Sequence, residues 1–402
     1  MKSALSPFRV RSFRFQWPAD LATSIGFEME ALILGWYVLT ATGSVEWLVV
    51  FSALTWVGAI LAPFLGVVGD RVGMRALLCA TRASYATLAC ALAVLTFTGA
   101  LEPWHVFVLY GIAGLSRPSD QAMRNVLIAE TVRSDSLMGA LGLSRTTADM
   151  AKVLGSLAGA GGVALIGMGP AYALVTALYV GAFLCSLGVA RPKPHTAHAT
   201  THDVISGLKD GARYVWTKPD ILGALCMAFL TNLLAYPFIL GLLPYVAKDV
   251  YEVGQAGLGY LAAAFAIGAL AGSLFLGANY LPLRAGRIML WNGALWFAAV
   301  VVFGLTRSYA AGLALLFFSG FVQSLCMTPI AMVMLRGASE AMRGRVMAMR
   351  VLAIWGLPLG LLASGPIIQH VGYAACAAIY GTLGVAATIA VGYRCRDALW
   401  RP

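Results

Sequence analysis

Three acidic side chains, Asp20, Glu28 and Glu30, interrupt the first long apolar stretch of the sequence. An ionisable group in such a stretch is costly unless it faces protein or water, so each is a candidate functional group. Burial can raise the pKa of a glutamate strongly, into the range where a proton is taken up and released at cellular pH. We therefore predict that these residues exchange protons, with Glu28 and Glu30 as the main candidates.

The three acids lie on different sides of the helix predicted for residues 17–40. Successive residues of an α-helix are about 100° apart. On this basis Asp20, Ser24 and Glu28 share one face, whereas Glu30 lies almost opposite, with Thr23 and Tyr37. We expect one face to line a cavity and the other to meet a neighbouring helix.

A structural role is the alternative for these acids. One of the two glutamates would then pair with a buried cation such as Arg82 or Lys152 and hold helices together. Another acid, Asp149, lies three residues before Lys152, and this spacing predicts a self-contained ion pair on one helix face.

A second charged group, Arg117, Asp120 and Arg124, lies near the end of the fourth apolar stretch. These residues are one to two helical turns apart. Their position near the end of the helix favours pairing in a gate over contact with a ligand.

The second half of the chain has no acid in the middle of an apolar stretch. Its polar side chains there are amides and aromatic hydroxyls or indoles, so we expect an aromatic and amide-lined cavity suited to a bulky amphiphilic compound. The candidate cavity residues are Tyr37, Asn232, Tyr236, Gln323 and Trp355.

The elements that must position these residues are transmembrane helices. The chain has 402 residues, of which 60% are hydrophobic and only 11% charged, and its mean hydropathy is +0.81. Since a spanning helix needs about 20 mainly apolar residues, we predict an all-α membrane protein of twelve transmembrane helices. The predicted spans are residues 17–40, 46–69, 76–98, 104–128, 138–166, 170–189, 219–246, 256–279, 287–306, 309–335, 346–370 and 373–393.

The net charge of +11 follows from topology and not from nucleic-acid binding. The lysines and arginines fall in alternate connections between spans, and the opposite connections hold only Lys248 and Arg307. By the positive-inside rule, both termini are cytoplasmic and the protein is a multi-pass protein of the cell (inner) membrane.

One long polar stretch divides the chain. We predict an N-terminal six-helix bundle at residues 1–190, a cytoplasmic linker at 191–218 and a C-terminal six-helix bundle at 219–402. Residues 204–216 form an amphipathic helix on the membrane face. The linker histidines are solvated side chains, and a metal site built from them is the alternative; these are His195, His198 and His202.

Small residues recur at the spacing that lets two membrane helices approach closely. Three GxxxG pairs begin at Gly155, Gly268 and Gly356. The seven cysteines form no CxxC pair, so neither a disulfide framework nor a metal site is expected from them.

The connection after the second span carries a recognisable motif. It reads Gly66-Val67-Val68-Gly69-Asp70-Arg71-Val72-Gly73-Met74-Arg75. This resembles the signature loop of the major facilitator superfamily, with Met74 where a second cation is usual. The resemblance implies the major facilitator fold and a cytoplasmic gate motif formed by Gly66, Asp70, Arg71, Gly73 and Arg75. We expect Asp70 to accept hydrogen bonds from the backbone N–H groups at a helix N-terminus, and Arg71 and Arg75 to pair with carboxylates.

Further stretches narrow the resemblance. They are ALILGWYVLTATGS, RPSDQAMRNVLIAETV, LPYVAKDVYEVGQAGLGYL and the run Arg343-Gly344-Arg345-Val346-Met347. Together they resemble the third drug:proton antiporter family, which includes macrolide and siderophore exporters. The resemblance implies export of a substrate against a proton gradient.

The prediction is therefore a proton-coupled exporter of a small amphiphilic compound that works by alternating access. Its partners would be the substrate, protons and membrane lipid, with no nucleic acid, and it would act as a monomer. The alternatives are uptake or facilitated diffusion of a metabolite, or a non-transporting membrane sensor. No catalytic or phosphate-binding motif is present, so neither an enzyme nor a cofactor is expected.

Overall fold

The computed structural model describes residues 6–132, 134–190, 201–278 and 284–399, and every regular element in them is helical. The first half contains η1 (Ser6–Arg9), α1 (Arg11–Thr42), α2 (Val45–Val57), η2 (Gly58–Ile60), α3 (Ala62–Val72), α4 (Met74–Phe97), α5 (Pro103–Gly114), α6 (Arg117–Thr131), α7 (Ser134–Ile166) and α8 (Met168–Leu187). It is followed by α9 (Thr201–Thr217), α10 (Pro219–Leu234), α11 (Pro237–Leu240), α12 (Leu243–Tyr245), η3 (Val246–Val250), α13 (Gln255–Ala278), α14 (Ala285–Leu305), α15 (Tyr309–Gly337), η4 (Glu340–Met342), α16 (Arg343–Leu352), η5 (Ala353–Trp355), α17 (Gly356–Val371), α18 (Tyr373–Arg394) and α19 (Arg396–Leu399).

Four predicted spans are broken and not continuous. The second consists of α2, η2 and α3, the fourth of α5 and α6, the seventh of α10 to α12, and the eleventh of α16, η5 and α17. Proline removes a backbone donor and clashes with the preceding turn, and Pro118, Pro237 and Pro244 each lie at the start of a new segment. Pro329, by contrast, lies inside the continuous α15.

Eight helices of the described chain are long and apolar enough to cross a membrane. They are α4, α7 from Gly139, α8, α13 to Gly277, α14, α15, the Arg343–Val371 run and α18. Two shorter apolar helices, Val45–Ile60 and Pro219–Leu234, lie in two further predicted spans. The protein is thus a multi-pass membrane protein.

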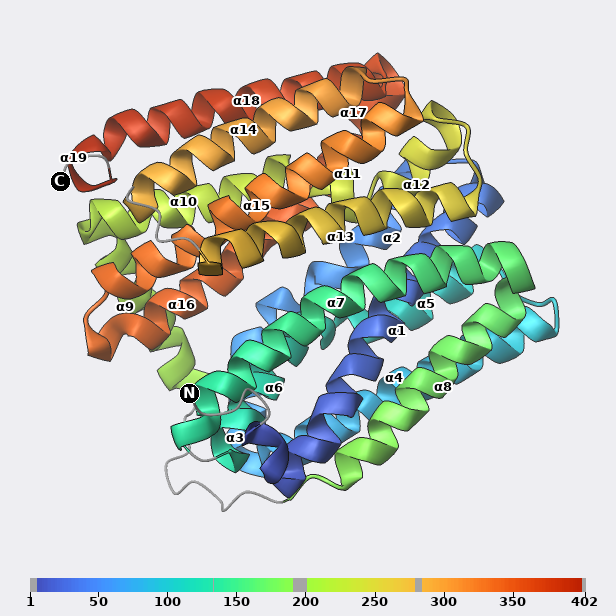
Figure 1. Ribbon diagram of the computed structural model, residues 1–402, viewed down its shortest axis with the longest axis horizontal. Helices are drawn as coiled ribbons and strands as arrows, with labels where there is room; N and C mark the ends of the chain where they lie inside the picture. Colours follow the sequence, from blue (N-terminus) through green and yellow to red (C-terminus); the bar gives the residue numbers. More distant parts are fainter. Residues whose placement is uncertain (1–5, 133, 191–200, 279–283, 400–402) are drawn as a thin grey trace.

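Two large hydrophobic clusters occupy different parts of the chain. The first is built from buried residues between Met29 and Tyr179. The second lies almost entirely between Val215 and Leu399, and only three residues of α2 join it from the first half: Val45, Val49 and Ala53. In Figure 1 the helices α1 to α8 accordingly lie together, and α10 to α18 form a second group beside them.

The two groups meet along two helix pairs, α7 with α13 and α2 with α17. A Cβ atom at Gly259 of α13 would lie 2.8 Å from Cβ of Ala160 in α7. A Cβ atom at Gly365 of α17 would lie 2.9 Å from Cγ2 of Val49 in α2. These contacts are near the turns at the α1–α2, α7–α8 and α17–α18 connections, so the halves meet closely at that end of the molecule.

The predicted amphipathic helix is present as α9. It packs against α16, where Gly211 is buried and a Cβ there would lie 3.2 Å from the Arg345 carbonyl oxygen. Lys209 and Arg213 are exposed; that they face lipid headgroups stays a prediction. Of the three linker histidines, His195 and His198 lie outside the described residues, as does the side chain of His202.

Candidate functional site

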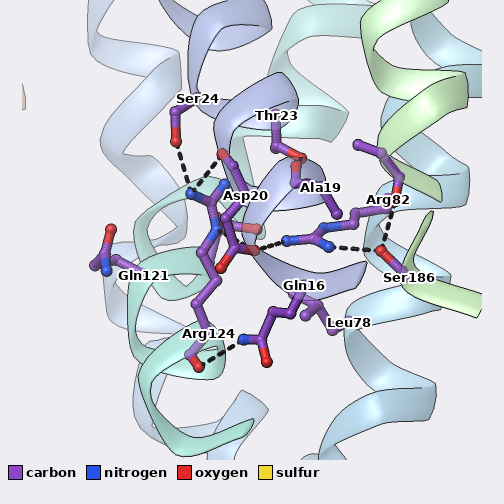
Figure 2. A network of polar contacts seen from close by, with 12 residues as sticks. Gln16, Ala19, Asp20, Thr23, Ser24, Leu78, Arg82, Gln121, Arg124 and Ser186 are labelled. Carbon is purple, nitrogen blue, oxygen red and sulfur yellow. Dashed lines mark hydrogen bonds and ion pairs between the residues drawn. The ribbon is translucent and has the colours of Figure 1, made fainter. Parts of the chain in front are cut away.

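Asp20 lies at the centre of a buried cluster that joins α1, α4 and α6. Figure 2 shows Arg82 and Arg124 approaching its carboxylate from two sides. Arg82 forms an ion pair with it, and Nε of Arg124 lies 3.6 Å from Oδ1. Arg124 also pairs with Asp120 one turn earlier on α6. Two acids and two arginines therefore neutralise one another.

Hydrogen bonds fix the arginines of this Asp20 cluster. Nη1 of Arg124 donates to Oγ of Ser24 at 2.6 Å and to the Asp20 carbonyl oxygen at 3.1 Å. Nη1 of Arg82 donates to Oγ of Ser186 in α8 at 2.5 Å. Charge-assisted hydrogen bonds are strong in an interior of low dielectric constant, so these bonds hold both arginines in one arrangement.

Glu30 is the centre of a second buried cluster. It forms an ion pair with Arg117 of α6. Its carboxylate also accepts hydrogen bonds from the hydroxyls of Tyr172 and Tyr179 in α8, the second at 2.9 Å. The guanidinium carbon of Arg117 lies 4.2 Å from the centre of the Tyr110 ring, a cation–π contact. Only 3% of Glu30 is exposed. Glu30 therefore has a buried cation as its partner, as the structural alternative predicts. That cation is Arg117, and neither Arg82 nor Lys152 pairs with Glu30.

Glu28 differs from both other acids. Among the described residues, its carboxylate has neither a hydrogen bond nor an ion pair, and the residue is partly exposed. It faces α7, where a Cβ at Gly155 would lie 2.6 Å from Cβ of Glu28. The charged groups that act on it are Lys152, Arg117 and Asp149.

Asp149 and Lys152 form the predicted pair on α7. Nζ of Lys152 lies 3.5 Å from Oδ1 of Asp149, and Nε of Arg145 lies 3.3 Å from Oδ2. Asp149 is buried, whereas both cations are substantially exposed. This charged strip of α7 lies on the helix that meets α13 of the other half.

The predicted cavity residues separate into two groups. Tyr37 donates to the carbonyl oxygen of Leu101 at 2.8 Å, within the first half, and Asn232 donates to the Ala228 carbonyl of its own helix at 2.8 Å. Tyr236 and Gln323 are brought together, since Nε2 of Gln323 donates to the Tyr236 hydroxyl oxygen at 2.9 Å. The indole nitrogen of Trp355 is buried and has no partner in the described part of the chain.

The signature loop forms the end of α3 and the turn into α4. Gly73 has φ +89°, a conformation that favours glycine, and caps the start of α4. Nη2 of Arg75 donates a hydrogen bond to the Leu187 carbonyl oxygen at 2.6 Å, and the carboxylate partner expected for this arginine stays a prediction. A cation there suits the negative end of α8. Gly66 has open space around it, Arg71 is exposed, and the side chain of Asp70 lies outside the described residues.

An apolar groove of about 790 Å³ lies on the outer side of the first half. Side chains of α4, α5 and α8 line it, among them Cys90, Trp104 and Val180. It contains none of the charged residues described above, so it is separate from the candidate site.

The family model described as transmembrane secretion effector matches residues 2–400. The chain belongs to the major facilitator superfamily. Among curated proteins, none matches the sequence.

Solved structures of major facilitator transporters have the same fold. The nucleoside transporter NupG superimposes with a TM-score of 0.74 at 14% identity, covering 95% of this chain and 98% of that one. The D-xylose–proton symporter superimposes with a TM-score of 0.73 at 14% identity, covering 94% of this chain and 96% of that one. The human organic anion transporter MFSD10 (TETRAN) superimposes with a TM-score of 0.68 at 16% identity, covering 96% of this chain and 99% of that one. The family and these relatives are transporters and not enzymes.

Sequence reasoning missed several residues of this superfamily member. Tyr172 and Tyr179 of α8 bind Glu30, and their spacing of seven residues on one helix face was an available signal. Arg350 falls within the predicted eleventh span, so the rule that flags charges inside spans applies to it. It is half-buried on α16.

Proposed function

We propose that this protein is a proton-coupled secondary transporter that exports a small amphiphilic compound by alternating access. The observation that carries the proposal is the state of Glu28. The described residues give it no ion pair, whereas Asp20 and Glu30 are each neutralised by arginine. A carboxylate outside any ion pair is better able to gain and lose a proton as its surroundings alternate than one held by an arginine.

The position of Glu28 supports the same role. It lies on α1 against α7, and α7 is one of the helices at which the two halves meet. A group at such a boundary changes its exposure when the halves rock against each other. Lys152 and Asp149 next to it provide charges that respond to its protonation.

The proposal includes the architecture predicted from the sequence: twelve spans in two six-helix bundles, with both termini in the cytoplasm of a cell (inner) membrane. The two separate hydrophobic clusters support the division into bundles. The contacts between the halves lie near the connections predicted to be outside, which supports a state that opens inward.

The direction of transport is proposed as export. The family description, transmembrane secretion effector, supports it. The narrower resemblance to drug:proton antiporters rests on the sequence motifs. Uptake is the second candidate, because the structural relatives include a D-xylose–proton symporter and a nucleoside transporter.

The test uses purified protein in liposomes with an imposed pH gradient and an enclosed pH-sensitive dye. Antibiotics, siderophores and metabolites are added in turn, and a transported compound dissipates the gradient. In whole cells, collapse of the proton gradient raises accumulation of an exported compound and lowers that of an imported one. If no compound in the panel moves protons or is itself moved, the protein does not couple the two fluxes, and a non-transporting role replaces the proposal.

A further inference from the structure

Arg350 is a cation of the second half for which the described residues provide no anionic partner. It lies in the last turn of α16 and is half-buried. Among the described residues, no carboxylate lies within ion-pair distance of it, although Glu30, Asp20 and Asp149 each neutralise a cation elsewhere. A half-buried guanidinium without an anion is costly, so a ligand that supplies one is favoured.

The groups around Arg350 also donate hydrogen bonds. Arg350 interacts electrostatically with Tyr236, in the turn between α10 and α11, and with Arg145 of α7 in the other half. The Tyr236 oxygen already accepts from Nε2 of Gln323 at 2.9 Å, so its own proton is available, and the described chain gives it no acceptor. These neighbours add a hydroxyl donor and a second positive charge, and neither supplies an anion to Arg350.

The next element adds a further donor to this region. Trp355 lies on η5, directly after α16, and its indole N–H is buried without an acceptor in the described chain. The adjoining Gly356 packs against α10, where its Cβ would lie 3.2 Å from Cβ of Asn232. Thus α16 and η5 are both placed against α10, which ends two residues before Tyr236.

We propose that Arg350 and the Tyr236 hydroxyl bind an oxyanion on the substrate, so that the transported compound is an aromatic or apolar body bearing one acidic group. Guanidinium and phenol donors match the two oxygens of a carboxylate or sulfonate. The aromatic rings nearby suit the apolar body. This inference rests on the proposed transport function and specifies its substrate class.

A negative charge on the substrate also favours export over uptake. In a cell whose interior is negative, moving one negative charge outward is favoured by about 2.3 kcal/mol per 100 mV. Export of an anion is therefore assisted by the membrane potential, whatever the proton stoichiometry.

The test measures binding and not transport. Three fluorescent probes share one aromatic body and differ in charge: dansylglycine is an anion, dansylglycinamide is neutral and dansylcadaverine is a cation. Each is titrated into purified protein in detergent, and its dissociation constant is obtained from the change in fluorescence. We expect wild-type protein to bind dansylglycine at least about tenfold more tightly than dansylglycinamide, which corresponds to about 1.4 kcal/mol.

Variants then assign this preference to the site. Arg350→Gln is expected to reduce the preference for the anion to less than about twofold, Arg350→Lys to retain most of it, and Tyr236→Phe to weaken it partly. Arg336→Gln is the matched control, since it removes the same charge from an exposed position in the second half. Size-exclusion profiles confirm that each variant remains folded.

Three outcomes would overturn the inference. In the first, wild-type protein shows no preference for the anionic probe or binds none of the three probes. In the second, Arg350→Gln keeps the wild-type preference. In the third, Arg336→Gln loses the anion preference as fully as Arg350→Gln does. Absence of substrate-dependent proton flux in liposomes of wild-type protein, with the anion preference intact, would instead contradict the proposed proton-coupled transport. The two proposals therefore fail independently.

Discussion

The three carboxylates of α1 differ in how they are neutralised. Asp20 faces two arginines, Glu30 faces Arg117 and two tyrosines, and Glu28 has no partner among the described residues. A buried pair that loses one member leaves an uncompensated charge behind, which costs far more than the pair itself contributes. Replacement by glutamine should therefore destabilise the protein at Glu30 but not at Glu28.

Glu30→Gln should destabilise the fold. The single carbonyl oxygen of glutamine can still accept a hydrogen bond from a tyrosine, but Arg117 is left without an anion, and we expect a loss of roughly 3 kcal/mol. Thermal unfolding of the purified protein in detergent measures it. Double replacement with Arg117→Met should recover part of the loss, and an unchanged melting temperature in Glu30→Gln would show that the pair is not structural.

Glu28→Gln should leave stability unchanged and abolish coupling. No ion pair among the described residues is lost, while the only unpaired proton-exchanging group of α1 is removed. We expect substrate-dependent proton flux in liposomes to fall by at least about tenfold, a change of about 1.4 kcal/mol in the barrier. Glu340→Gln, at a highly exposed position, is the control. Flux at the wild-type level in Glu28→Gln would remove this residue from the mechanism.

At the scale of elements, glycine spacing sets how closely helices pack. The three predicted GxxxG pairs all lie at helix contacts: Gly155 and Gly159 against α1, Gly268 and Gly272 against α15, and Gly356 and Gly360 against α10. A Cβ at Gly159 would lie 2.7 Å from Cα of Met29. Because that neighbour is backbone, the two helices must move apart to accept a methyl group. The packing of α7 on α1 therefore holds Glu28 in its place.

Gly159→Ala should lower both stability and transport. We expect a cost of roughly 1 to 3 kcal/mol from overpacking, measured by thermal unfolding, together with reduced proton flux. Gly161→Ala, on the same helix with open space around it, should instead be neutral or stabilising by up to about 1 kcal/mol. Equal effects of the two variants would show that helix propensity, and not the α1–α7 contact, decides the outcome.

At the scale of the whole molecule, the halves are closed against each other at one end. Oγ of Ser52 in α2 lies 3.5 Å from the carbonyl oxygen of Gly241. A cavity between α1, α2, α5 and the α11–α12 segment has a volume of only about 40 Å³. That space holds a water molecule and not a substrate. Alternating access requires this contact to open.

A disulfide between Ser52→Cys and Gly241→Cys should therefore stop turnover. A Cβ at Gly241 would lie 3.2 Å from Cβ of Ser52, close to the roughly 3.8 Å that a disulfide requires. We expect the oxidised double variant to bind substrate but to transport less than about a tenth of the wild-type amount, and a reductant to restore transport. Each single variant is a control for the native cysteines. Full transport by the cross-linked protein would show that this contact does not open during the cycle.

The sequence by itself determined the membrane-embedded helical fold, the superfamily and the candidate functional residues. These follow from properties that act locally or repeat along the chain: runs of apolar residues, the loop from Gly66 to Arg75, glycines four residues apart and charges inside spans. The helix breaks at Pro118, Pro237 and Pro244 also follow from local backbone chemistry, although each of these prolines lies inside a predicted span.

Only the tertiary structure decided which charges neutralise each other. Asp20 and Arg82 are 62 residues apart, and Glu30 and Arg117 are 87 apart. Their pairing depends on how α4 and α6 are placed around α1. Helical periodicity puts Glu28 and Glu30 on different faces but does not say which face meets an arginine. The physical reason is that an ion pair is defined by distance in space, and packing of whole helices sets that distance.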